Sequence, residues 1–435
     1  MRVSDLCRYA LRTCVAAALL AGCGGSQPPL AAPGLMAQGR AIAAHADRYE
    51  VVHGFATFRD GAESENLIVA GNRFYGTTFA GGFKGKTDCK QGCGVVFSMV
   101  LDGSSYRVLH RFQGGTDGAG ATSITLVDNV IFGVTYQGGG GPCPDYGFGF
   151  VGCGTVFRIS PDGSRYAVLH IFAHHDARGD GAAPADVIFY NGDLYGSTYG
   201  GGGKCHPNGC GTIFRLSLQG TKFTIIHAFS GGRDGASPGD GLVVMSNALF
   251  GTTQHGGTDP KGIGNGTLFR VSGGSQYRQI YSLHYGMPEA GLLAYDGRLF
   301  GTTATGGKPD CPAGCGSVYS IRPNGTGFSM LYAFDSLTSA DAPEANLVTL
   351  GGMLYGTSTA GGTHCQPGGC GTIFRISPSG RDFRVVHSFK GGAQGASPGQ
   401  IVSVGTDIYG VAAAGPSCGH YGNCGVVFRL QTAER

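Results

Sequence analysis

The segment Leu194-Tyr195-Gly196-Ser197-Thr198 is followed, after a Gly- and Cys-containing connection, by Gly211-Thr212-Ile213-Phe214-Arg215. Both segments are rich in β-branched and aromatic residues, which favour strands, and the glycines around them favour turns. The first segment contains the motif aromatic-Gly-x-Thr, and the second contains Gly-x-aliphatic-aromatic. The number and spacing of these two motifs decide the fold.

Each motif occurs seven times in the chain of 435 residues. The first motif, or a close variant of it, begins at Tyr75, Phe132, Tyr195, Phe250, Phe300, Tyr355 and Tyr409. The second begins at Gly94, Gly154, Gly211, Gly266, Gly316, Gly371 and Gly425, at steps of 60, 57, 55, 50, 55 and 54 residues. Repeats of this length with several strands are typical of propeller blades.

Each repeat divides into four predicted strands, which the third full repeat shows well at residues 186–190, 194–199, 211–216 and 223–229. Asn191-Gly192 joins the first two strands, and Asn-Gly is a strong hairpin signal. A similarly tight turn joins the last two. The connections from second to third strand, and from fourth strand to the next repeat, are longer. If the first strand is innermost, both long connections lie on one face, which we call the long-loop face.

The two ends of the repeat region complement each other. Residues 49–55 have the pattern of a fourth strand, and residues 425–430 have the pattern of a third strand. We therefore predict an all-β, seven-bladed β-propeller of four-stranded blades, whose ring is closed by the N-terminal strand completing the last blade. A stacked solenoid is the alternative, but it would leave unpaired sheet edges and would not explain complementary ends.

The composition agrees with a compact, turn-rich domain. Of the 435 residues, 82 are Gly, 41% are hydrophobic and only 14% are charged. The Gly content lacks the period of collagen, and the apolar content is too high for a disordered chain. The net charge of +3 includes no basic run outside the N-terminus, so we expect no nucleic-acid partner.

The N-terminus has the pattern of a bacterial lipoprotein signal. Three arginines precede an apolar run at residues 15–20, and Leu20-Ala21-Gly22-Cys23 resembles a lipobox. We predict a signal peptide over residues 1–22, a lipidated Cys23 with a flexible tether over residues 23–46, and a propeller over residues 47–435. An ordinary signal peptide with a chance Cys is the alternative. Because Gly24 is not Asp, we expect an outer-membrane lipoprotein, periplasmic or surface-exposed, that touches the membrane through its lipid alone.

Twelve cysteines remain after the signal peptide and Cys23, and they fall into six local pairs. The predicted pairs are Cys89 with Cys93, Cys143 with Cys153, Cys205 with Cys210, Cys311 with Cys315, Cys365 with Cys370, and Cys418 with Cys424. The fourth repeat has no pair, and Asn265 stands before its motif Gly. An even number in an exported chain predicts disulfides that staple the loops between second and third strands. Metal binding is the competing interpretation, but it would need pairs that converge on one ion.

Polar and aromatic residues of the long connections are the candidate binding residues. The predicted set is Asp60, Asp117, Asp180, Asp234, Asp341, Tyr136, Tyr199, His255 and Tyr421. The competing interpretation is that each Asp only caps its own Asp-Gly turn. No Asp-x-Asp-x-Asp spacing indicates calcium, and we expect neither a metal ion nor a cofactor.

The fourth strands share a recurring His, which Tyr replaces in two repeats. The residues are His53, His110, His170, His227 and His387, with Tyr281 and Tyr332. Because Tyr can take the place of His, we predict semi-buried aromatic residues that pack between blades and do not bind metal. Two Gly-x-Ser-x-Gly matches have Pro after Ser, which cannot donate the N–H of a nucleophile elbow. The sequence therefore shows no catalytic constellation.

The repeats resemble the GloVer tandem repeat of choice-of-anchor bacterial surface proteins. The residues that carry the resemblance are 194–201, 211–215 and 229–238, and it covers nearly all of residues 47–431. The resemblance implies a location and a repeat architecture without a defined activity. The chain departs from it in its Cys pairs and at His284-Tyr285-Gly286-Met287-Pro288, which lacks the Asp-Gly-Ala segment.

These observations predict a monomeric binding module that recognises a glycan, an envelope polymer or a protein through its long-loop face. One alternative is a propeller enzyme acting on polysaccharide, a hydrolase or lyase, which would need two converging carboxylates or a Tyr or His with a carboxylate. The other alternative is an assembly scaffold with a large exposed apolar patch.

Overall fold

The computed structural model describes residues 47–432 apart from 83–88, 90, 142, 144–151, 174–178, 204, 206–208, 240, 259–264, 308–314, 336–339, 366–367 and 416–423. The chain divides into two units, Met1–Ala44 and His45–Arg435. The predicted signal peptide and tether, with Cys23, lie outside the described residues, as do Cys311, Cys418 and Tyr421.

The described residues form seven antiparallel sheets, which we number as blades in chain order. Blades 1 to 3 consist of β2 (Ala62–Ala70), β3 (Arg73–Ala80), β4 (Val95–Val100) and β5 (Arg107–Arg111); β6 (Ala119–Val127), β7 (Val130–Gln137), β8 (Thr155–Ile159) and β9 (Ala167–Ile171); and β10 (Ala182–Tyr190), β11 (Asp193–Gly200), β12 (Thr212–Ser217) and β13 (Phe223–Ala228). Short 3-10 helices η1 (Phe58–Asp60), η2 (Gly115–Asp117) and η3 (Gly392–Gln394) lie in connections between blades.

Blades 4 to 7 follow the same order, with one irregular first strand and one borrowed fourth strand. They consist of β14 (Ala236–Pro238) with β15 (Val243–Met245), β16 (Ala248–His255), β17 (Thr267–Ser272) and β18 (Gln276–Ser282); β19 (Leu293–Tyr295), β20 (Arg298–Thr303), β21 (Ser317–Ile321) and β22 (Ser329–Ala333); β23 (Val348–Leu350), β24 (Met353–Ser358), β25 (Thr372–Ile376) and β26 (Arg384–Ser388); and β27 (Ala396–Val404), β28 (Asp407–Ala414), β29 (Val426–Gln431) and β1 (Arg48–Gly54).

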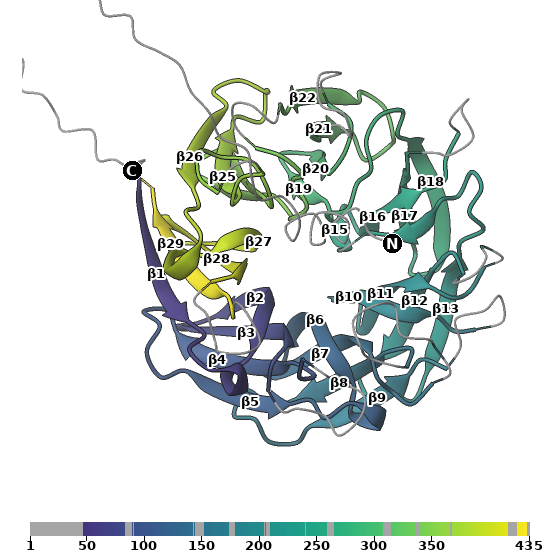
Figure 1. The fold of residues 1–435 in the computed structure, drawn as a ribbon. Coiled ribbons are helices and arrows are strands. Elements are labelled where there is room, and N and C mark those ends of the chain that lie inside the picture. The colour runs from purple at the N-terminus through teal and green to yellow at the C-terminus, as the bar shows by residue number, and fades with distance from the viewer. Residues whose placement is uncertain are drawn as a thin grey trace, which may run out of the picture. The chain divides into compact units, whose positions relative to one another are not determined.

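The blades form a ring, with first strands such as β2, β6 and β10 toward its middle and fourth strands such as β5, β9 and β13 at its rim (Figure 1). The predicted seven-bladed propeller is therefore confirmed. Because each blade is an antiparallel meander, the tight turns share one face of the ring and the long connections share the other. No helix in the described part of the chain is long and apolar enough to cross a membrane.

The N-terminal strand closes the ring as predicted. β1 pairs with β29 from Arg48 opposite Gln431 to Gly54 opposite Val426 (Figure 1). Arg429 of β29 binds Glu50 at 3.1 Å, and Arg384 binds Asp47 at 3.0 Å. Pairing of the two ends leaves no unpaired edge at the join, which a linear array would expose.

Close packing between strands explains the two sequence motifs. In each blade the motif Gly of the second strand lies beneath the motif aromatic residue of the third strand, and a Cβ at Gly196 would lie 2.4 Å from Phe214 Cζ. The Thr198 hydroxyl accepts from the backbone N–H of Thr212 at 3.0 Å and donates to Gly200 O at 2.9 Å. The motifs thus encode the join between the second and third strands.

Substitution of the motif glycine tests this packing. We expect Gly196→Ala to lower the free energy of unfolding by about 1–3 kcal/mol, because the new methyl group overlaps both Phe214 and the backbone oxygen of Asp186. Chemical denaturation followed by circular dichroism measures the change. Gly368→Ala is the matched control, since a Cβ there has no atom within 4 Å. Equal stability of the two variants would contradict the packing argument.

Candidate functional site

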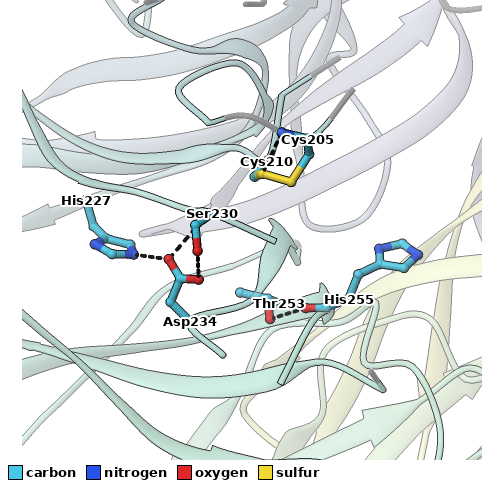
Figure 2. Close-up of a disulfide and its surroundings, with 7 residues drawn as sticks. All are labelled: Cys205, Cys210, His227, Ser230, Asp234, Thr253 and His255. Atoms are coloured by element: carbon cyan, nitrogen blue, oxygen red, sulfur yellow. Dashed lines mark hydrogen bonds and ion pairs between the residues drawn. A yellow bond between two sulfur atoms is a disulfide. The ribbon is translucent and has the colours of Figure 1, made fainter. Parts of the chain in front are cut away.

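The loop Asp after blade 3 binds its own connection and the fourth strand before it. Asp234 accepts from the backbone N–H of Ser230 at 3.0 Å and also from the Ser230 hydroxyl (Figure 2). The Nε2 atom of His227, on β13, lies 3.1 Å from the same carboxylate. This Asp therefore caps its turn and holds the imidazole of its own blade.

The same arrangement follows blades 1 and 2. Asp117 accepts from the backbone N–H of Gln113 at 2.8 Å and lies 3.1 Å from His110 Nε2. Asp180 lies 2.9 Å from His170 Nε2 and accepts from the backbone N–H of Ala173 at 2.9 Å. Burial raises the pKa of Asp180, but the hydrogen bonds outweigh burial, and the net pKa lies below its usual range.

The remaining two predicted aspartates depart from this arrangement. Asp60 accepts from the Thr57 hydroxyl at 2.7 Å, while the Nε2 atom of His53 is buried without a partner. Asp341 is not equivalent to the other four. Its backbone pairs with Ala360, as the backbone of Ala236 pairs with His255 in blade 4, so Asp341 corresponds to Ala236 at the start of a first strand. Burial raises the pKa of Asp341.

The recurring His and Tyr residues of the fourth strands stack on the next blade around the whole ring. The stacked pairs are His53–Tyr106, His110–Tyr166, His170–Phe223, His227–Tyr277, Tyr281–Phe328, Tyr332–Phe383 and His387–Tyr49, with ring centroids 3.6–4.9 Å apart. The predicted packing between blades is confirmed. Tyr277 also donates its hydroxyl to the backbone oxygen of Asp234 at 2.7 Å, which joins the stack to the loop.

Disulfides staple the second-to-third-strand loops as predicted. The described pairs are Cys89–Cys93, Cys143–Cys153, Cys205–Cys210 and Cys365–Cys370. Cys315 and Cys424 are also disulfide-bonded, and their predicted partners lie outside the described residues. The Cys205–Cys210 bridge (Figure 2) packs against the next connection, because a Cβ at Gly231 would lie 2.4 Å from Cys205 Sγ. Each bridge therefore stiffens a loop of the long-loop face.

Blade 4 replaces its missing bridge by a hydrogen bond. Asn265, which stands where the other blades have Cys, donates from Nδ2 to the backbone oxygen of His284 at 2.9 Å. The bond ties the second-to-third-strand loop of blade 4 to the connection that leads into blade 5. Because disulfides persist in oxidising compartments, the bridges of the other blades indicate a location outside the cytoplasm.

The predicted aromatic residues of the candidate face lie deeper than expected. Tyr136 is 3% exposed and belongs to a hydrophobic core, so it cannot contact a ligand on the surface. Tyr199 is half-buried and packs against the same core. His255 is half-buried, and burial lowers its pKa. All three lie near the ends of second strands, β7, β11 and β16, in which most residues are buried.

One exposed residue was missed in the predicted set. Tyr285 is 71% exposed, more than any other large hydrophobic residue of the described chain. Its signal in the sequence is the segment His284-Tyr285-Gly286, where the fourth-to-first connection loses its Asp-Gly-Ala pattern. Within the described residues, no group of three or more His, Cys, Asp or Glu side chains is placed to hold a metal ion.

Comparison with protein families matches residues 144–367 and 312–435 to the Gloeobacter/Verrucomicrobia repeat. The chain belongs to this repeat family. The match begins within blade 2, and blade 1 has the same GloVer motifs and strand order although it precedes the matched residues. A search of curated proteins gives no match.

Solved structures share the fold of this GloVer protein at low sequence identity. A puromycin-hydrolyzing peptidase of Mycobacterium tuberculosis aligns with a TM-score of 0.53 and 12% identity over 88% of this chain and 55% of its own. The extracellular domain of a proposed one-component system from B. thetaiotaomicron aligns with a TM-score of 0.50 and 11% identity over 87% and 39%. This chain thus spans about half or less of each, and the likeness shows the fold alone.

Two histidines have a buried Nε2 atom without a partner: His53, which belongs to the closing strand β1, and His387, which stacks on Tyr49 of that strand. They predict acid sensitivity. Burial, then the charges of Lys390 and His364, lower the pKa of His387 to about 4. The folded state therefore favours neutral His387, and stability falls as the pH drops from about 6.5, where the unfolded chain begins to bind the proton, to about 4. Screening by water at this half-buried site keeps the loss below about 3 kcal/mol.

Replacement by the residue that other blades use tests this prediction. We expect His387→Tyr to keep the stack on Tyr49, as Tyr281 and Tyr332 do on their neighbours, and to flatten the stability curve between pH 6.5 and pH 4. Urea denaturation at several pH values gives both curves. Parallel curves for wild type and variant would show that His387 does not titrate on unfolding.

Proposed function

We propose that this protein is a lipid-anchored binding module of the bacterial cell envelope that recognises a glycan, an envelope polymer or a protein through its long-loop face. The observation that carries the proposal is the set of disulfide-stapled loops on this one face. Loops held on a rigid scaffold are common recognition elements, and stiff loops lose less entropy on binding.

The position of the chain entry supports the same choice of face. Arg48 pairs with Gln431, which also pairs with Asp407 at the tight turn between β27 and β28. The chain therefore enters the propeller on the tight-turn face. The long-loop face is therefore the face opposite the described start of β1.

The carboxylates favour binding over catalysis. Asp60, Asp117, Asp180 and Asp234 each accept a hydrogen bond within their own connection, and three of them also hold a His of the preceding strand. A polysaccharide hydrolase or lyase needs carboxylates directed at substrate, and these are occupied by capping. Exposed apolar residues on several separate strands likewise do not favour an assembly scaffold.

The anchor is tested by fractionation of cells that express the full chain. We expect the wild-type protein in the outer-membrane fraction, carrying the mass of a diacylglyceryl group on Cys23, and the Cys23→Ala variant in the aqueous fraction. Cys7→Ala is the matched control, because that residue lies within the predicted signal peptide. Membrane association that survives Cys23→Ala would exclude the lipid anchor.

The binding face is tested with the purified full chain in detergent micelles. The probes are hexasaccharides, peptidoglycan fragments and purified secreted proteins. We expect at least one of them to bind, and disulfide reduction to weaken that binding by about tenfold or more while circular dichroism keeps its β-sheet signal. Asp162→Ala, on the tight-turn face, is the control and leaves binding unchanged. If none of the probes binds, or if Asp162→Ala weakens binding as much as disulfide reduction does, the proposal is contradicted.

A further inference from the structure

Tyr285 takes the place that the loop Asp has in other blades. A Cβ at Gly306 would lie 2.8 Å from Gly286 Cα, and a Cβ at Gly256 would lie 2.6 Å from Gly235 Cα. Gly286 and Gly235 are therefore equivalent. The residue before Gly235 is Asp234, so its counterpart in the connection between blades 4 and 5 is Tyr285.

The replacement accompanies a change on the neighbouring strand. Asp234 holds His227 and has a side chain that is 22% exposed. In the connection between blades 4 and 5 the fourth-strand residue is Tyr281, which stacks on Phe328 and needs no carboxylate partner. Tyr285 is thus released from the capping role and extends to 71% exposure.

The backbone around Tyr285 is held on both sides. His284 O accepts from Asn265 Nδ2 at 2.9 Å, and the His284 ring packs edge-on to Tyr281. The Met287 N–H donates to the Thr305 hydroxyl at 3.0 Å, and the Met287 oxygen accepts from the Ala304 N–H at 2.8 Å. An exposed aromatic ring on a fixed backbone is pre-organised for a ligand.

We propose that Tyr285 is the stacking platform of a site for a neutral saccharide, at the junction of blades 4 and 5 on the long-loop face. The inference rests on the proposed binding function and names its ligand class. The face of the Tyr285 ring would pack on the C–H face of a sugar. Asn265 and Thr305 hold the backbone on either side of Tyr285, and their remaining polar atoms are the candidates for binding sugar hydroxyls.

The surroundings favour a saccharide over a protein partner. The other exposed large hydrophobic residues of the described chain lie on strands, at Val51, Ile171, Phe189, Ile225, Val244 and Met330. None of them belongs to the connection that carries Tyr285. A protein interface needs an apolar centre within about 800 Å² per partner, whereas one aromatic ring among polar groups suits a sugar.

Isothermal titration of the full chain in detergent with cellohexaose, chitohexaose, maltohexaose and xylohexaose tests the site. We expect binding of at least one hexasaccharide, a loss of about tenfold or more in affinity for Tyr285→Ala, and near wild-type affinity for Tyr285→Phe. Tyr285→Asp introduces the residue that four other connections have, at Asp60, Asp117, Asp180 and Asp234, and is expected to fold and to lose binding. Ile225→Ala removes a residue that is 40% exposed on the outer strand β13 and serves as the control.

The outcomes separate this inference from the broader proposal. If a hexasaccharide binds Tyr285→Ala with an affinity within about twofold of the wild type, the Tyr285 site is overturned, but the proposed binding module is not. Failure of all four hexasaccharides to bind the wild-type chain overturns the saccharide class, even where a purified protein binds at Tyr285. Equal losses in Tyr285→Ala and Ile225→Ala, with unchanged thermal stability, overturn the assignment to this residue.

Discussion

The ring depends on one repeated contact, the stack between a fourth-strand His or Tyr and an aromatic residue of the next blade. It occurs at all seven blade junctions, including the one where β1 closes the ring. Each stacked pair of side chains buries apolar area on both blades and excludes water from the junction between them. A His in this place must remain neutral or be paired, because an isolated buried charge is unfavourable.

The chain satisfies that requirement in three ways around the ring. His110, His170 and His227 are each paired with a loop Asp, and this pairing commits the carboxylate to the architecture. Tyr281 and Tyr332 need no acid. His53 and His387 have a buried Nε2 atom without a partner, and both contact the closing strand or belong to it. The stack between blades therefore has two consequences. Where its His has no carboxylate partner, the fold is sensitive to acid, and where Tyr replaces His, the loop position that otherwise carries Asp is available for recognition.

Much of the architecture could be predicted because it is local and repeated. Motif residues such as Gly196 and Phe214 predict that the second and third strands of a repeat pair. Seven copies of these motifs, in a chain whose two ends complement each other, predict a closed ring of blades. The candidate site was predicted less well. Tyr136 and Asp234 follow the motifs that suggested exposed loops, but one is buried in the core and the other is bonded to His227. Their environment depends on neighbouring blades, which periodicity within one repeat does not describe.

The sequence by itself determined the number of blades, the order of their strands, the disulfide partners that lie in the described residues and the strand that closes the ring. Those features follow from short-range patterns and from counting. Only the tertiary structure decided that the loop aspartates are committed to their own turns, that Asp341 occupies a different position from the other four, and that Tyr285 stands exposed where those turns have Asp. The reason is physical: exposure and hydrogen-bonding partners are set by contacts between residues that are distant in sequence and belong to adjacent blades or connections.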